Sequence, residues 1–428
     1  MKIKKLRIHN AFTNILSLMM IFLMLVTSNS MWLLKVHRRI PTTVLRFTLT
    51  GIILISCILP ILSNPKKLSM PKFIRCLFVA GMASVFAVTT NTNRTVYMKY
   101  ALVIIIAGIV YFSVIDNPEK IWNLYTDVVV CICIMSLIFY VFGSILHIIK
   151  PTGVFVFSWG DNVGMRCSSY FNIYFEPQRL DFFGFKNIVR NSAFFPEATM
   201  FSFVISIALG HELLVNPAPD KRKCIILTVT ALSTTATLGM MTAVMVYVFR
   251  YIARIMGEKK ISLKNIGILC LAGAGILLVK KILDYKTTTD RGEGSMEVRM
   301  DHVVACLKAF SHNPAFGVGY NNLNGVLRYA QYKQGISVGL LYTVACGGIV
   351  MLIVYMYPLM YYTITNYRHK NYNHMFYGIL IFILIFVNAI TNTTIILLMI
   401  GYMTAYMCRS STVPEKMLSM LKIRSGRV

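Results

Sequence analysis

The sequence predicts an all-α polytopic membrane protein. Of its 428 residues, 56% are hydrophobic and only 14% are charged, and the mean hydropathy is +0.64. A soluble chain of this length would carry about 25% charged residues. Apolar runs of about twenty residues recur along the chain, and each is long enough to cross a bilayer as a helix. We therefore expect a single integral membrane domain over residues 1–428.

The apolar runs predict about twelve transmembrane helices. Residues 224–253 are assigned to two short helices, because one continuous helix would place the basic segment RYIARIMGEKKISLK outside the cell. The break is expected at STTATLG (233–239), where small and hydroxyl residues allow a tight passage. The expected helices are 11–28, 44–62, 73–90, 99–115, 124–148, 193–215, 224–236, 237–253, 265–284, 337–358, 374–390 and 391–408.

The charge distribution predicts the topology. The formal net charge is +27, from 43 Lys and Arg against 16 Asp and Glu. With an uncleaved first helix and both termini in the cytoplasm, most basic residues face inward, as the positive-inside rule requires. The exception is the short outer loop with Lys35, Arg38 and Arg39. A nucleic-acid partner is excluded, because the positive charge divides between the two sides of the membrane.

Two long loops are expected outside, at 149–192 and 280–336, and both are basic and are expected to contain short helices. In the second loop, apolar residues at intervals of three and four predict an amphipathic helix over about 296–312, with Ser295 as its N-cap. Arg291 would then precede the helix and Arg299 would lie in its first turns. That end of a helix suits an anion such as phosphate.

The stretch SHNPAFGVGYNN (311–322) follows this helix. Pro314 is expected to end the helix, and Gly317 and Gly319 permit positive φ angles and close backbone approach. We interpret the stretch as closing a loop that handles a phosphate-bearing substrate. The alternative is a turn that only returns the chain to the membrane.

The first loop ends in RNSAFFPEATMF, which places Arg190 and Glu197 at the membrane surface. Glu197 is either a cap or a dipole partner of the following helix, or a candidate base in a chain with few carboxylates. The aromatic residues of the loop could stack on sugar rings or rest among lipid headgroups. They are Tyr170, Phe171, Tyr174, Phe175, Phe182, Phe183 and Phe185.

The cysteines show no spacing typical of metal ligands, and no metal is expected. Most of the ten lie inside apolar runs, where they act as small hydrophobes. Only Cys167 and Cys306 fall in the expected outer loops. They either form a disulfide, in an oxidising compartment, or remain two free thiols.

Three segments together resemble the O-antigen ligase and polymerase superfamily of bacterial envelopes. RNSAFFPEATMFSFVISIAL is similar to that family's arginine-to-glutamate segment before a helix, and LSTTATLGMMTAV to its hydroxyl-rich helix break. RMDHVVACLKAFSHNPAFGVGYNN is similar to its large-loop signature. The segments occur in the family's order, so the resemblance covers most of the chain and implies a GT-C type membrane glycosyltransferase fold.

The resemblance implies a metal-independent glycosyltransferase without cofactor, with its active site outside the bacterial cytoplasmic (inner) membrane. Its donor would be an oligosaccharide linked through pyrophosphate to a polyprenol, with membrane lipid and a chain-length regulator as further partners. The residues carried over as pyrophosphate ligands are Arg190, Arg291 and Arg299. Direct displacement would invert the anomeric centre. Glu197 is the first choice of general base, and Asp301 or His302 the second.

The sequence favours a polymerase of repeat units for O-antigen, lipopolysaccharide or capsule. Ligases of the family present a histidine before the helix that follows the large loop, whereas this chain reads QYKQGISVGLL with Ser337. A ligase that transfers a finished glycan to a lipid or protein remains the alternative. A flippase of lipid-linked sugar is a third class of function. A flippase is expected to carry arginines inside its membrane spans, whereas in this sequence the basic residues lie only at the edges of the spans.

Overall fold

The chain folds as a mostly helical membrane protein. The computed structural model describes residues 2–35, 41–63, 95–115, 117–159, 162–182, 185–257, 281, 284, 290–319, 322–333, 335–336, 338–387 and 393–410. Within these residues, four helical segments are long and apolar enough to cross a membrane: Glu119–Ile145, Ala198–Val215, Thr237–Gly257 and Gly339–Arg368. Several shorter apolar helices pack beside them.

The helices follow the apolar runs of the sequence. Before the sheet come α1 (Lys2–Thr27), α2 (Met31–Leu34), α3 (Thr42–Ser63), α5 (Thr95–Val114), α6 (Glu119–Phe139) and its π-helical continuation η2 (Tyr140–Ile145). After the sheet come α7 (Ala198–Gly210), η3 (His211–Val215), α8 (Lys221–Ser233), α9 (Thr237–Gly257), α11 (Asp290–His312), α12 (Leu323–Leu327), α13 (Gly339–Arg368), α14 (Tyr372–Val387) and α15 (Thr394–Ser410).

Every expected helix that falls on described residues coincides with one of these helices. The ranges 73–90 and 265–284 lie outside the described residues, apart from Lys281 and Asp284. The expected end of one helix is wrong: α13 continues ten residues past Pro358. Proline is tolerated inside membrane helices, because neighbouring groups satisfy the freed carbonyl.

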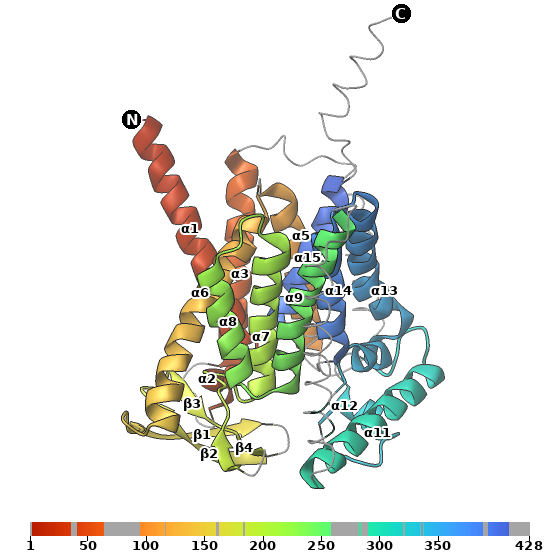
Figure 1. Cartoon of the computed structure of the whole chain (residues 1–428). Helices are drawn as coiled ribbons and strands as arrows, with labels where there is room; N and C mark the ends of the chain where they lie inside the picture. Colours follow the sequence, from red (N-terminus) through yellow and green to blue (C-terminus); the bar gives the residue numbers. More distant parts are fainter. Residues whose placement is uncertain are drawn as a thin grey trace, which may run out of the picture.

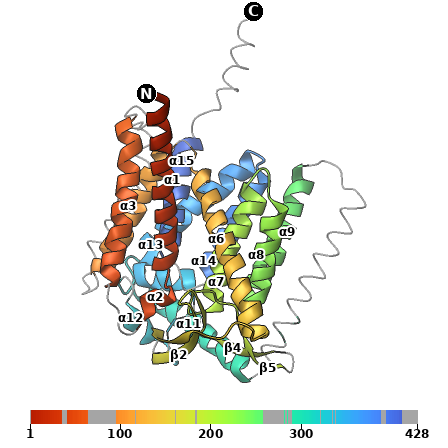
Figure 2. The same cartoon turned by 90° about the vertical axis from the view of Figure 1, so that its left-hand side faces the viewer.

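The two long segments that were expected outside the membrane, named here the outer segments, lie at one end of the helix bundle. Figures 1 and 2 show the sheet and α11 at this end, and the start of α1 and the end of α15 at the opposite end. Which end faces the cytoplasm stays a prediction from the charge distribution. Helix α7 runs through the centre, buried along almost its whole length against α6, α8, α9 and α14.

The first outer segment is a β-structure, so the expectation of an all-α fold with a helical first loop is wrong. Three antiparallel strands pair in the order β1 (Gly153–Trp159), β2 (Asn162–Tyr170) and β3 (Tyr174–Glu176). A separate hairpin follows, formed by β4 (Arg179–Phe182) and β5 (Phe185–Val189). In β1 the side chains alternate, with Phe155 and Phe157 buried and Val154 exposed, and this period of two is typical of a half-buried strand.

Of the seven aromatic residues noted in this segment, three are buried in the sheet and one is exposed, and the side chains of Phe182, Phe183 and Phe185 lie outside the described residues. Tyr170, Tyr174 and Phe175 are buried, and Phe175 packs edge-on against Phe155. Phe171 is exposed at the turn before β3. For the three buried rings, both expected roles, sugar stacking and headgroup contact, are therefore corrected to packing.

Helix α11 forms as expected, but its start and its buried face differ from the expectation. It begins at Asp290, so Arg291 lies in its first turn and Ser295 is not the N-cap. Arg299 is nine residues from the start, which is about 13.5 Å along the helix axis. The free N–H groups of the helix start therefore do not act together with Arg299.

The face of α11 that packs on α12 and α13 is made of small side chains. Ala305, Cys306 and Ala309 are buried against Ala345 and Cys346 of α13. The apolar residues that predicted the helix, including Met300, Val304 and Leu307, are exposed. Small residues allow the backbones of two helices to approach closely. For this reason α11 packs on α12 and α13 with its small side chains and leaves the larger apolar ones exposed.

The stretch after α11 docks into a kink of α13. Gly348 breaks α13 with φ 62° and ψ −156°, and the peptide groups around it bond to residues 314–319. Val318 and Gly319 donate their N–H groups to the carbonyls of Ala345 and Cys346, at 2.9 and 3.0 Å, and Ile349 donates to the Pro314 carbonyl at 2.8 Å. Gly317 and Gly319 both take positive φ angles, 67° and 106°. Glycine is needed where backbones come this close.

We expect Gly348→Ala to destabilise the folded protein by about 2–5 kcal/mol. This is the sum of the cost of a positive φ angle for alanine and the cost of a clash between its Cβ atom and the neighbouring backbone. A Cβ atom there would lie 2.3 Å from the Ala315 carbonyl oxygen. The melting temperature of the purified protein in detergent measures the effect. Gly294→Ala in α11 is the control, since its Cβ would meet nothing within 4 Å. Equal melting temperatures for both variants would contradict the packing described.

Candidate functional site

The site begins at a break between two membrane helices. Helix α8 ends at Ser233 and α9 begins at Thr237, so the expected split of residues 224–253 is confirmed. Thr235 in the break has φ 50°, which is uncommon and strained for a β-branched residue. The Ser202 and Thr234 hydroxyls share a hydrogen bond at 2.8 Å and tie the break to α7.

Arg190 reaches this break from the end of the β4–β5 hairpin. Its backbone N–H donates to the Gln178 carbonyl at 3.1 Å. The side-chain Nε–H lies 3.2 Å from both the Thr234 carbonyl and the Thr235 hydroxyl oxygen, and Nη1 donates to Gln178 Oε1 at 3.2 Å. The strained Thr235 therefore helps to orient the guanidinium of Arg190.

The charge of Arg190 has no direct counter-ion. All its hydrogen-bond acceptors are neutral, and no carboxylate of the described residues lies within ion-pair distance of it. Burial lowers the pKa of Arg190, and the more distant charge of Glu197 acts in the opposite direction. Because arginine stays protonated in proteins, a partly buried cation remains here, and it has N–H groups on Nη1 and Nη2 that bond to no residue in the part of the chain that the structure describes. Such a group is suited to an anionic ligand.

Glu197 stands at the start of α7, with backbone angles φ −133° and ψ 137°. Glu197 occupies the N-cap position, but its side chain makes no capping hydrogen bond to the helix. Of the expected alternatives, the capping bond does not apply, whereas the role of a partner of the helix dipole stays a prediction. Instead, Oε1 accepts a hydrogen bond of 2.7 Å from Trp159 Nε1. The other oxygen, Oε2, has no hydrogen-bond partner in the part of the chain that the structure describes.

Gln178 links Arg190 to Ala198, the residue after Glu197, and no sequence pattern had indicated this role. Its Oε1 accepts from Arg190 Nη1 and from the backbone N–H of Ala198, each at 3.2 Å. The side-chain amide thus fixes the hairpin, the guanidinium and the first turn of α7 relative to one another. A neutral residue in the sequence EPQRL carries no pattern that would single it out.

The carboxylate of Glu176 is a second feature that the sequence did not indicate. It is buried and its Oε1 accepts from Ser144 Oγ and Tyr170 Oη, both at 2.8 Å, while Oε2 lies 3.5 Å from the Arg179 guanidinium. Burial, followed by the hydrogen bond to Glu176, raises the pKa of Tyr170. These bonds attach the sheet to η2 and give Glu176 a structural role.

In the second outer segment, Arg299 is exposed on α11 and has no hydrogen-bond or ion-pair partner among the described residues. Arg291 lies on the same helix. No hydrogen bond within the described ranges joins Arg299 to Arg190 or Glu197. The structure places the two arginine-bearing elements, α11 and the β4–β5 hairpin, at the same end of the bundle (Figure 1).

Asp301 and His302 bond to residues 331–332, which follow α12. Asp301 Oδ2 accepts from the N–H groups of Gln331 and Tyr332, at 2.8 and 2.9 Å. Desolvation acts to raise the pKa of Asp301, but these two N–H groups outweigh it and the pKa is lowered. His302 is buried, its Nε2 lies 3.4 Å from the Tyr332 carbonyl oxygen, and burial lowers its pKa. Both side chains already have structural partners.

The two cysteines of the outer segments are free thiols, so the disulfide alternative is excluded. Cys167 on β2 and Cys306 on α11 are both buried. Burial raises the pKa of each thiol to about 12. Such thiols are protonated and inert at neutral pH.

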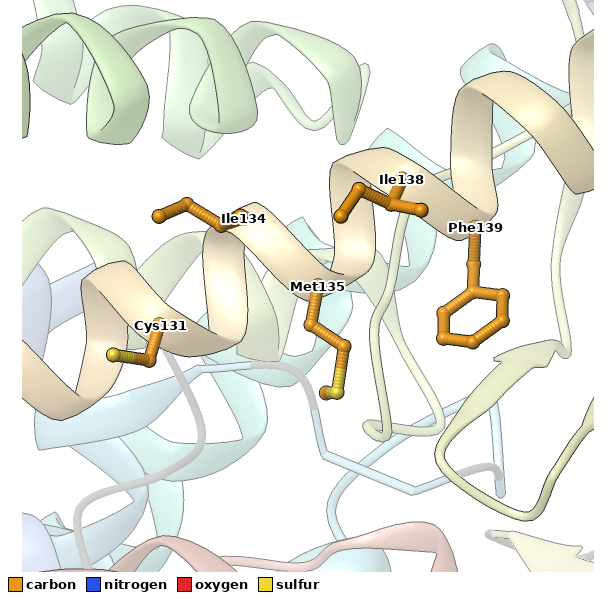
Figure 3. A pocket seen from close by; sticks show the side chains of 5 residues that line it. All are labelled: Cys131, Ile134, Met135, Ile138 and Phe139. Atoms are coloured by element: carbon orange, nitrogen blue, oxygen red, sulfur yellow. The ribbon is translucent and has the colours of Figure 1, made fainter.

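A hollow on α6 is chemically unlike the Arg190 site. Figure 3 shows its lining, which comes entirely from Cys131, Ile134, Met135, Ile138 and Phe139 of one helix. All of these side chains are apolar or weakly polar, so the hollow offers nothing to a phosphate or a sugar hydroxyl. Among the described residues, no group of three His, Cys, Asp or Glu could hold a metal ion.

Comparison with known proteins does not assign the site. No protein-family model matches this chain. No curated protein matches it either. The chemistry of the site therefore has to be inferred from its own residues.

Proposed function

We propose that the chain is a membrane glycosyltransferase that joins oligosaccharide repeat units carried on polyprenyl pyrophosphate. The observation that carries this proposal is the partly buried guanidinium of Arg190, whose hydrogen-bond acceptors among the described residues are all neutral and whose remaining N–H groups have no partner among those residues. A fixed cation at the end of a membrane bundle suits a lipid-linked diphosphate. The sequence resemblance to the O-antigen polymerases supports the same choice of substrate.

The reaction transfers a glycan between two oxygen atoms. A hydroxyl oxygen of the incoming repeat unit bonds to the anomeric carbon of the growing chain, and the bond from that carbon to the pyrophosphate oxygen breaks. The electron pair leaves with the polyprenyl pyrophosphate, whose developing charge Arg190 and Arg299 stabilise. The hydroxyl proton passes to Glu197. Attack from the side opposite to the leaving group inverts the anomeric centre.

Glu197 is the base that the contacts favour. Its Oε2 has no partner in the described part of the chain, whereas Asp301 and His302 are engaged with residues 331–332. Glu197 also lies close enough to Arg190 for their charges to interact. One side chain would therefore hold the leaving group while its neighbour takes the proton.

The role proposed for Arg299 predicts a loss of long glycan chains. In a deletion strain complemented with variants, Arg299→Ala and Arg299→Lys should both lower chain extension at least tenfold, because lysine lacks the planar fork that binds a diphosphate with two bonds. The surface-polysaccharide ladder on gels measures this, with immunoblotting to check insertion. Lys308→Ala is the matched control, an exposed basic residue on the same helix. Normal ladders from both Arg299 variants would remove Arg299 from the site.

The glycan that accumulates in the deletion strain tests the function itself. A polymerase predicts single repeat units on the final acceptor. Long chains that remain on the polyprenyl carrier would instead indicate a ligase. Repeat units retained on the cytoplasmic side would indicate a flippase, and either of these results would overturn the proposal.

A further inference from the structure

Trp159 donates the one hydrogen bond that the structure records on the Glu197 side chain. The distance from Trp159 Nε1 to Glu197 Oε1 is 2.7 Å, at the short end of the range for an N–H donor. Trp159 is the last residue of β1 and pairs with Asn162 of β2. Its partly buried ring packs against the main core. The ring is thus held by the sheet, while its N–H points at the carboxylate.

Glu197 itself has little else to fix it. Its side chain makes no capping bond to α7, and no residue within ion-pair distance neutralises it in the described part of the chain. A glutamate has three side-chain torsions, so a single strong bond to one oxygen decides where the other oxygen lies. A tryptophan suits this task, because its rigid ring has only two torsions and keeps its N–H in a fixed place.

We propose that Trp159 is a positioning residue that holds Oε1 of Glu197, so that Oε2 faces the hydroxyl of the acceptor sugar. This inference rests on the proposed function, in which Glu197 takes the proton of that hydroxyl. A base displaced by about 1 Å loses much of its effect, because proton transfer requires hydrogen-bond distance. Trp159 contacts no reacting atom and acts only through Glu197.

The chain contains a matched control for this hydrogen bond. Trp32 of α2 also donates its Nε1–H over 2.7 Å, but to the backbone carbonyl of Asn172. Its ring stacks on Phe194, with centroids 4.7 Å apart. Trp32→Phe and Trp159→Phe therefore remove the same group at the same bond length, and each leaves an aromatic ring in place. Only the Trp159 variant changes a bond to Glu197.

The test measures initial rates of chain extension in proteoliposomes, with lipid-linked repeat units extracted from the deletion strain and rates expressed per folded protein. Trp159→Phe should slow extension about tenfold, the lower end of what a hydrogen bond to a charged group contributes. Trp32→Phe should keep the rate within about twofold, since exchanges that spare the site have small effects. Equal losses in both variants would overturn the inference, because they would reflect general packing of the sheet.

A double-mutant cycle separates positioning from structural support. Glu197→Asp retracts the carboxylate by one methylene group, so that it no longer reaches Trp159 Nε1. In this background, Trp159→Phe should change the rate less than twofold. A loss of the same factor as in the wild type would show that Trp159 does not act through Glu197. If the wild-type protein extends no chains at all, the proposed function fails. If the wild type is active but the effects of the Trp159 and Glu197 substitutions are independent, only the role of Trp159 is removed.

Discussion

Arg190→Lys and Arg190→Ala should each slow chain extension about 10²–10³-fold, the range seen when a fixed donor to a developing negative charge is removed. The guanidinium uses Nε to bond the helix break at Thr234 and Thr235, and Nη1 to bond Gln178. Lysine has a single nitrogen, so it cannot keep these bonds and still present donors to a diphosphate. Alanine also leaves the Gln178 side-chain oxygen without one of its two donors.

The measurement is the rate of extension of lipid-linked repeat units in isolated membranes, per amount of inserted protein. Arg166→Lys is the control, because Arg166 is an exposed arginine on strand β2 of the same outer segment. It should retain the wild-type rate. A wild-type rate for Arg190→Lys would show that Arg190 is a structural link between the hairpin and the helix break and holds no pyrophosphate.

Glu197→Gln should slow chain extension by about 10²–10⁴-fold, the usual contribution of a general base. The substitution changes the shape of the side chain very little, and the amide oxygen can still accept from Trp159 Nε1. It removes the negative charge and with it the ability to take a proton. The folded structure should therefore survive while the reaction stops.

Thermal melting in detergent and the extension rate are measured on the same preparation of this variant. Glu297→Gln provides the comparison, since Glu297 is an exposed carboxylate of α11 that accepts a hydrogen bond from the Tyr332 hydroxyl. It should leave both quantities close to wild type. Full activity of Glu197→Gln would exclude Glu197 as the base, and a large drop in its melting temperature would assign the loss to folding.

Local composition was enough to locate the helices. Apolar runs placed most of the described helices, because a helix that crosses a bilayer needs a long enough apolar run. Helix α11 was predicted instead from the spacing of its apolar residues, and α2 and α12 were not predicted. The split at residues 233–239 was also predictable, since the basic segment after α9 demanded a second crossing. The strands were not predicted although Phe155 and Phe157 alternate with outward residues, because so short an alternating run does not show which other segment it pairs with.

The sequence identified one half of the candidate site better than the other. The family resemblance indicated Arg190, and the scarcity of carboxylates indicated Glu197, and the structure places these two residues near each other. Asp301 and His302 were the second choices of base, but they bond to residues 331–332. The position of a charged residue in a loop does not show whether its side chain already bonds to another part of the protein.

The sequence by itself determined a helical membrane protein with a break at residues 233–236 and with two basic segments between its helices. Only the tertiary structure decided which side chains meet: Gln178 and Trp159 became partners of Arg190 and Glu197, and Gly348 opened α13 to receive residues 314–319. The reason is physical. Hydropathy depends on each residue and its neighbours in the chain, whereas a hydrogen bond between distant segments depends on how the helices and the sheet pack.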